Sequence, residues 1–218
     1  MQRSLETEYL DRTDLPEATV LRCYRQLTRI QALLGNTRAI VAALRRDPLP
    51  VRRVLDIGCA SGGVLLAVRR KLAVEVLGID LKPAPAPEIP VPILCADATR
   101  DLLPAADVAY CTCLAHHLPP GDLEDMIRNV RRSCRRFILL DLVRHRLPMA
   151  LFRMSATPFF NPFVVEDGLI SIRRSYTPAE MRAVVSRALD GSGARFHHRV
   201  APFGIRQVVD IDYRGGTS

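Results

Sequence analysis

The sequence lacks the features of a membrane or secreted protein. It has no apolar run of about 18 residues, the length that a membrane span requires. Its first residues do not follow the charged, apolar and small-residue order of a signal peptide. We therefore expect a cytoplasmic location and no membrane span. At 218 residues, 48% of them apolar, the chain is long enough for one domain with a substantial core and short for two.

Lysine is nearly absent, and the cysteines lack a paired spacing. Lys71 and Lys82 are the only lysines, so arginine carries the net charge of +8. The arginines are scattered, mostly in pairs beside predicted elements, and no aromatic residues interleave with them as a base-stacking platform. A nucleic-acid partner is therefore not favoured. The six cysteines fit reduced, mostly buried thiols rather than a disulfide framework.

What the sequence does contain is an apolar strand that runs into a glycine-rich turn at residues 54–63. Glycine tolerates a positive φ and lets a ligand approach the backbone closely. Ser61 is expected to cap the following helix, whose first N–H groups would face the same place. Two cofactor classes use such a turn. Gly58, Ala60 and Gly63 fit the dinucleotide fingerprint G-x-G-x-x-G. Gly58, Ala60 and Gly62 instead fit the pattern G-x-G-x-G, with alanine in place of the central glycine.

Three carboxylates distinguish the two classes. Asp56 precedes the turn, where it would repel a dinucleotide pyrophosphate but attract a cationic ligand. Asp80 ends a strand predicted at residues 74–80, and Asp97 lies near the end of another predicted at 91–98. A dinucleotide enzyme has no need of the third acid. Each acid alone could be a turn residue at the end of a strand, but that explanation is much weaker for all three.

The run from Asp56 to Gly62 resembles the E/D-x-G-x-G-x-G element of class I S-adenosylmethionine-dependent methyltransferases, with Ala60 in place of the central glycine. The likeness covers roughly residues 50–212 and is closest to ubiquinone/menaquinone-type and secondary-metabolite methyltransferases. It implies that Asp56 and the turn hold the methionine end of S-adenosylmethionine, Asp80 the ribose and Asp97 the adenine. The full set of implied cofactor-binding residues is Asp56, Gly58, Cys59, Ala60, Gly62, Asp80, Leu81, Asp97, Ala98 and Thr112.

The pattern of elements predicts an α/β fold. From Val54 to Asp141 strands and helices alternate, which indicates a parallel sheet. Helix starts are predicted at 14–17 and 177–180, and residues 196–212 read as a hairpin. The resemblance implies a three-layer, Rossmann-like sheet of seven strands that ends in this antiparallel hairpin. Residues 1–50 would form an N-terminal helical cap and 51–218 the methyltransferase domain. Segment 147–175, rich in Phe, Pro and Met, would be a mobile cover over an apolar acceptor or a buried helical insertion.

A cluster of cysteines and histidines at residues 111–117 follows the fourth predicted strand. His116 or His117, which the sequence does not distinguish, could act as a general base on the acceptor. Alternatively, one histidine packs against the loop and the other is solvated. Zinc is a third possibility, but Cys-x-Cys beside adjacent histidines is not the usual ligand spacing, and adjacent histidine side chains are expected to diverge. No metal site is predicted.

The sequence thus predicts methyl transfer from S-adenosylmethionine to an oxygen atom of a small, largely apolar acceptor. The expected acceptor is aromatic, polyketide-like or quinone-like. Positioning is the main task, since aligning reactants is worth effective molarities of about 10⁵–10⁸ M and a base only about 10²–10⁴ in rate. Three alternatives remain open: an RNA methyltransferase, a non-catalytic partner protein that binds the cofactor, and a nicotinamide oxidoreductase. The sequence leaves the oligomeric state open.

Overall fold

The computed structural model describes residues 1–11, 16–83 and 91–215. The described residues form one seven-stranded sheet in the order β3-β2-β1-β4-β5-β7-β6. Strand β7 is antiparallel to both of its neighbours, and the other pairs are parallel. The strands are β1 Arg53–Ile57, β2 Glu75–Asp80, β3 Ile93–Cys95, β4 Ala106–Thr112, β5 Cys134–Asp141, β6 Arg195–Val200 and β7 Gln207–Asp212. The predicted fold class and the C-terminal hairpin are confirmed.

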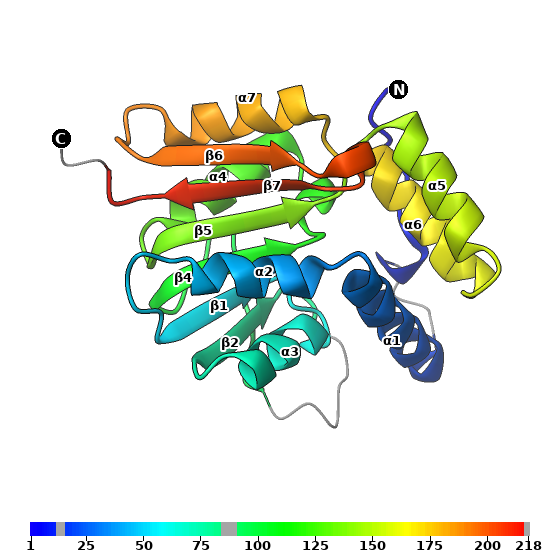
Figure 1. Ribbon diagram of the computed structural model, residues 1–218, viewed down its shortest axis with the longest axis horizontal. Coiled ribbons are helices and arrows are strands. Elements are labelled where there is room, and N and C mark those ends of the chain that lie inside the picture. Colours follow the sequence, from blue (N-terminus) through cyan, green and yellow to red (C-terminus); the bar gives the residue numbers. More distant parts are fainter. Residues whose placement is uncertain (12–15, 84–90, 216–218) are drawn as a thin grey trace.

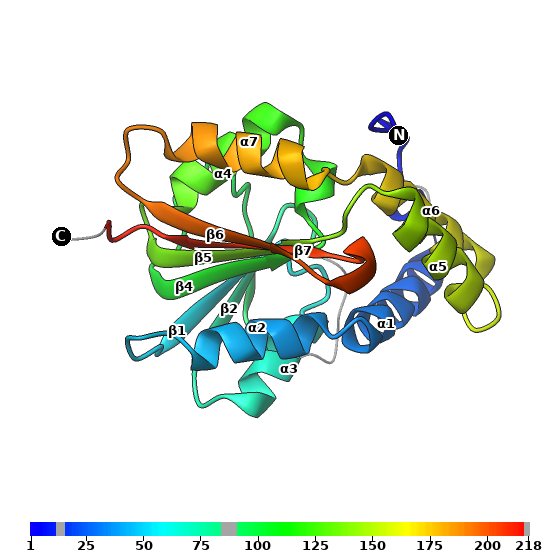
Figure 2. The ribbon, with the colours of Figure 1, turned by 45° about the horizontal axis from the view of Figure 1, so that its top comes forward.

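Helices cover both faces of the sheet and gather at one end of it (Figure 1). In both views α2 and α3 lie on one face and α4 and α7 on the other, while α1, α5 and α6 stand together at one end (Figure 2). The α-helices are α1 Glu17–Leu33, α2 Asn36–Arg45, α3 Gly63–Lys71, α4 Pro120–Val130, α5 Arg146–Ala156, α6 Pro162–Arg174 and α7 Pro178–Leu189. Short 3-10 helices are η1 Tyr9–Asp11, η2 Ala115–His117 and η3 Pro202–Gly204.

The sheet divides the core into two layers because successive side chains of a strand point to opposite faces. In β1, Leu55 and Ile57 pack in the core cluster that includes residues of α4 and α7. Val54 packs in the cluster that includes residues of α2 and α3. Strands buried on both faces read as continuous apolar runs, which is why the central strands could be found in the sequence.

Several local predictions need correction. Gly62, at φ 73°, is the N-cap of α3, so Ser61 does not cap that helix as predicted. The third strand covers only residues 93–95 rather than 91–98. Segment 147–175 forms two helices, α5 and α6, which is the helical alternative. α1 begins after Pro16, which provides no side-chain cap, while Asp14 of the helix start predicted at 14–17 lies outside the described residues.

Two expectations from composition can be compared with the structure. Within the described ranges, no helix combines the length and the apolar character needed to cross a membrane. All six cysteines are free thiols, and four of them are buried. The prediction that most of the cysteines are buried is therefore confirmed.

Candidate functional site

The glycine-rich turn lies at the carboxyl end of β1 and is hydrogen-bonded to β2. The backbone N–H groups of Gly58 and Cys59 donate to the Ile79 carbonyl, at 2.8 and 3.1 Å. The N–H of Ala60 donates to Asp80 Oδ2 at 2.8 Å. Gly58, Ala60 and Gly62 all have a positive φ, of 70°, 48° and 73°. The Asp80 side chain thus reaches the turn itself.

Neighbouring residues close over the turn so tightly that two of its glycines have no room for a side chain. A Cβ on Gly58 would lie 2.8 Å from Leu114 Cδ1, and one on Gly63 would lie 2.7 Å from Thr28 Oγ1. Leu114 belongs to the loop after β4, and Thr28 belongs to α1. The N-terminal helix therefore packs against the start of α3, beside the turn.

Asp56 lies in β1, directly before the turn, and its side chain is buried. Among the described residues, Asp56 Oδ1 and the Tyr110 hydroxyl are buried without a hydrogen-bond partner. Burial raises the pKa of Asp56 well above its ordinary value; the nearby Tyr110 hydroxyl opposes this rise without meeting hydrogen-bond geometry, and the charge of Asp80 adds to it. A buried acceptor with no donor favours a cationic ligand. The residues present therefore fit the ammonium end of S-adenosylmethionine.

The other predicted cofactor residues differ in their surroundings. Asp97 Oδ1 accepts hydrogen bonds from the N–H and hydroxyl of Thr99, at 2.9 and 2.7 Å, and these bonds lower the pKa of Asp97. The Cys59 side chain packs on β2, since its Sγ would lie 2.5 Å from a Cβ on Gly78. Of the remaining predicted residues, Leu81 is exposed, Ala98 is half-buried and Thr112 is buried.

The structure distinguishes the two histidines, which the sequence did not. His116 is buried, and its ring Nδ1 lies 2.7 Å from Asp141 Oδ1 while its backbone N–H donates to Asp141 Oδ2 at 2.9 Å. The His117 side chain is 29% exposed. Asp141 ends β5, so it follows the same strand-end pattern as Asp80, and that pattern was the signal that could have found it.

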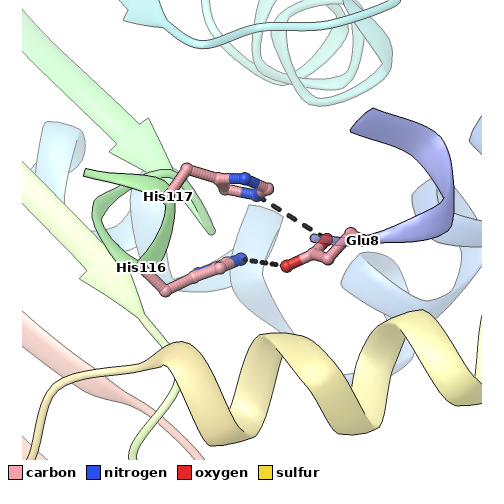
Figure 3. A group of neighbouring side chains, drawn as sticks. All are labelled: Glu8, His116 and His117. Atoms are coloured by element: carbon pink, nitrogen blue, oxygen red, sulfur yellow. Dashed lines mark ion pairs between the residues drawn. The ribbon is translucent and has the colours of Figure 1, made fainter. Parts of the chain in front are cut away.

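Glu8 was missed by sequence reasoning and lies beside both histidines (Figure 3). Its Oε1 is 3.5 Å from His116 Nε2, and its Oε2 is 3.8 Å from His117 Nε2. The expected divergence of the adjacent histidines is thus not observed, because both rings turn toward Glu8. No local pattern marks residue 8 in the sequence, since only the fold brings the N-terminal segment to this loop.

Arg3 joins the N-terminal segment to this loop by hydrogen bonds. Its guanidinium donates to the carbonyls of His116 and Leu118, at 3.1 and 2.8 Å, and lies 4.1 Å from the centre of the Tyr176 ring. Two surface cavities, of about 310 and 320 Å³, lie elsewhere, one on α2 and α3 and one beside Arg136 and β6, and none of the predicted site residues lines them.

Comparison with known proteins agrees with the fold. Residues 54–136 match a family model described as a methyltransferase domain. No curated protein matches the chain. Among solved structures, the plantazolicin methyltransferase BamL is 13% identical with a TM-score of 0.69, over 90% of this chain and 91% of that one.

Two further solved structures are similar to this chain. Human N-acetylserotonin methyltransferase is 14% identical with a TM-score of 0.65, over 97% of this chain and 63% of that one. The mitomycin 7-O-methyltransferase MmcR is 17% identical with a TM-score of 0.60, over 90% and 59%. At these identities the structures show the shared fold.

The sheet order, the glycine turn and the match over residues 54–136 are those of a Rossmann-like methyltransferase domain. Residues 54–136 are accordingly a methyltransferase domain, and S-adenosylmethionine is the predicted cofactor.

Proposed function

We propose that the chain transfers a methyl group to a small, largely apolar acceptor, at an oxygen atom and by in-line displacement. The observation that carries the cofactor half of this proposal is the buried Asp56 carboxylate oxygen, which has no donor among the described residues and lies directly before the glycine turn. S-adenosylmethionine, when bound, supplies an electrophilic methyl group on a sulfonium.

The chain's own residues would bind and orient the two reactants. Asp56 would accept a hydrogen bond from the ammonium of the methionine end, and Asp80, already joined to the turn through Ala60, would accept from the ribose hydroxyls. Asp97 would take the adenine end. The side chains of Leu114 and Thr28, which lie against the turn, would exclude water from it. Because the reaction is a direct displacement, this alignment supplies most of the rate.

The apolar acceptor is supported by the helices beside the site. Met149, Phe152 and Phe160 pack with buried residues of α5 and α6. These two helices stand at the same end of the molecule as α1 (Figure 1). The names of the similar structures, plantazolicin, N-acetylserotonin and mitomycin methyltransferases, also describe small-molecule acceptors. The segment 147–175 is therefore proposed as one wall of the acceptor pocket.

The proposal does not depend on a histidine base. Both His116 and His117 lie in the loop that follows β4. That either one acts as a general base stays a prediction. Their surroundings differ, however, because the ring of His116 is buried between Asp141 and Glu8. A cytoplasmic location likewise stays a prediction.

Calorimetry with S-adenosylhomocysteine tests the cofactor site. We expect tight binding to the wild type and a loss of tenfold or more in Asp80→Ala, which removes both the proposed ribose acceptor and the hydrogen bond to Ala60. Asp125→Ala is the matched control, because Asp125 is an exposed acid that pairs with Arg128 on the surface of α4. Equal affinity of Asp80→Ala and the wild type would refute the assigned site.

Release of S-adenosylhomocysteine in cell extracts, followed by mass spectrometry, tests turnover and identifies the methylated product. Release that requires small-molecule fractions supports the proposal. Release that requires RNA would instead favour an RNA methyltransferase. No release across many extracts, with binding intact, would favour a non-catalytic partner protein.

A further inference from the structure

Three potential ligand side chains converge at the loop after β4. Glu8 lies just before η1, and His116 and His117 belong to η2. One ligand atom from each of the three lies within 4.8 Å of the other two. Glu8 and His116 are buried, and His117 is partly exposed. Figure 3 shows both imidazole rings directed at the same carboxylate.

The spacing of these atoms suits a shared cation better than direct hydrogen bonds. Glu8 Oε1 lies 3.5 Å from His116 Nε2, and Glu8 Oε2 lies 3.8 Å from His117 Nε2. Hydrogen bonds of this kind measure about 2.7–3.2 Å. Tetrahedral coordination with bonds of about 2.0–2.1 Å places ligand atoms roughly 3.3–3.5 Å apart. The two carboxylate–imidazole distances are thus close to those of such a centre, and the three ligand atoms all lie within 4.8 Å of one another.

Asp141 orients the His116 ring for metal binding. It accepts hydrogen bonds from the backbone N–H groups of His116 and Leu142, at 2.9 and 2.6 Å, so it acts as a carboxylate acceptor. Its third partner, His116 Nδ1 at 2.7 Å, must then carry the proton. In the neutral ring the Nε2 lone pair therefore faces Glu8 Oε1, and two acceptors face each other. A carboxylate–histidine pair of this kind is the usual support of a metal ligand.

Polar and charged side chains surround the Glu8 carboxylate. Ser171 donates to Glu8 Oε1 at 2.9 Å, and Arg174 Nη1 lies 3.8 Å from the same oxygen, beyond hydrogen-bond distance. Arg3 donates to the carbonyls of His116 and Leu118.

We propose that Glu8, His116 and His117 bind a divalent transition cation of the Zn²⁺ class. Two imidazoles and one carboxylate suit such cations and leave a fourth position for water or for an oxygen of a bound molecule. A metal-bound Nε2 has no lone pair for a proton, so in the metal-loaded protein both histidines are ligands rather than bases. The proposal stands on this cluster alone and does not rest on methyl transfer.

Metal titration of the chelator-treated, dialysed protein tests the site. Zn²⁺ binding is measured by calorimetry, and Co²⁺ binding by the visible absorption of the bound ion. We expect the wild type to take up one equivalent of Zn²⁺ with a dissociation constant of micromolar order or tighter. Glu8→Gln and His117→Ala should each weaken binding at least tenfold, and Asp141→Asn by about 10–100-fold. His197→Ala is the matched control, since His197 is an exposed histidine on β6.

The outcomes separate the possible readings. No uptake by the wild type would overturn the proposal. Equal affinity of the wild type, Glu8→Gln and His117→Ala would place any bound metal elsewhere and also overturn it. Because His117 is partly exposed, His117→Ala keeps the test usable if Glu8→Gln does not fold. S-adenosylhomocysteine titrations on the same samples show independently whether the cofactor site is intact.

Discussion

At the scale of single residues, Asp56 has the most demanding environment of the proposed cofactor carboxylates. It is buried in a central strand, and its pKa is raised by burial, while the nearby Tyr110 hydroxyl opposes the shift. A carboxyl with a raised folded-state pKa stabilises the fold fully below the unfolded pKa of about 3.9, and this contribution is lost as the pH rises through the folded-state pKa. Without ligand, the ionised Asp56 is thus a source of instability that a cationic ligand would relieve.

This argument predicts a pH-dependent effect of Asp56→Asn. Asparagine has nearly the same shape but does not titrate, so the stability of the variant relative to the wild type should rise as the pH increases from 4 toward 8. Thermal unfolding without ligand, measured across this range, checks it. Asp125→Asn on the surface of α4 serves as the control. A difference between Asp56→Asn and the wild type that does not change with pH would contradict the assigned environment.

At the scale of elements, α3 and α7 begin in different ways although the sequence suggests a side-chain cap for both. The Thr177 hydroxyl accepts from the Glu180 N–H, and the Glu180 carboxylate accepts from the Thr177 N–H, which is a complete capping box. At α3 the N-cap is Gly62 and no side chain caps the helix. The start of α3 is thus left with N–H groups for a ligand, whereas α7 satisfies its own.

Alanine substitution should therefore affect the two helices unequally. Thr177→Ala removes a side-chain cap, and we expect a loss of about 0.5–2 kcal/mol in the free energy of unfolding. Ser61→Ala removes a hydroxyl that caps nothing, and we expect a change within about 0.5 kcal/mol. Urea denaturation of both variants checks this. A larger effect of Ser61→Ala than of Thr177→Ala would be inconsistent with the observed caps.

At the scale of the whole molecule, Arg136 joins parts of the chain that are far apart in sequence. This buried residue of β5 donates to Asp210 on β7, at 2.8 and 2.6 Å, and to Asp47 after α2, at 2.8 Å. The Asp47 side chain is 0% exposed. Burial alone would raise the pKa of Asp47, but hydrogen bonds from Arg136, Leu49 and Arg135 more than offset it and lower that pKa.

Replacing Arg136 should strongly destabilise the fold. Arg136→Met leaves two carboxylates without their shared partner, and we expect a loss of about 3–5 kcal/mol at pH 7. Because the pKa of Asp47 is lowered in the folded state, its contribution is present above the unfolded pKa of about 3.9 and is lost as the pH falls. The gap between Arg136→Met and the wild type should therefore narrow toward pH 3.

Thermal unfolding against pH measures this gap. Arg53→Met is the control, since Arg53 and Glu75 form an exposed pair whose loss should cost about 0–1 kcal/mol. Similar losses in the two variants would argue against a structural role for the Arg136 network.

The sequence by itself determined the features that depend on near neighbours in the chain. The strands from Val54 to Asp141, the capping box at Thr177 and the positions of Asp56, Asp80 and Asp97 follow from apolar runs and turn residues, which are local. Even here a local rule failed at Ser61, because the left-handed backbone of Gly62 takes the capping position.

Only the tertiary structure decided the surroundings of the histidines. Glu8, His116 and Asp141 come from the N-terminal segment, the loop after β4 and the end of β5, and no pattern in the sequence pairs them. The parallel pairing of β4 and β5 brings their carboxyl ends together. Arg3 of the N-terminal segment donates a hydrogen bond to Leu118, in the loop after β4. Contacts between residues so far apart in sequence depend on how whole elements pack. The local spacing of residues along the chain does not reveal that packing.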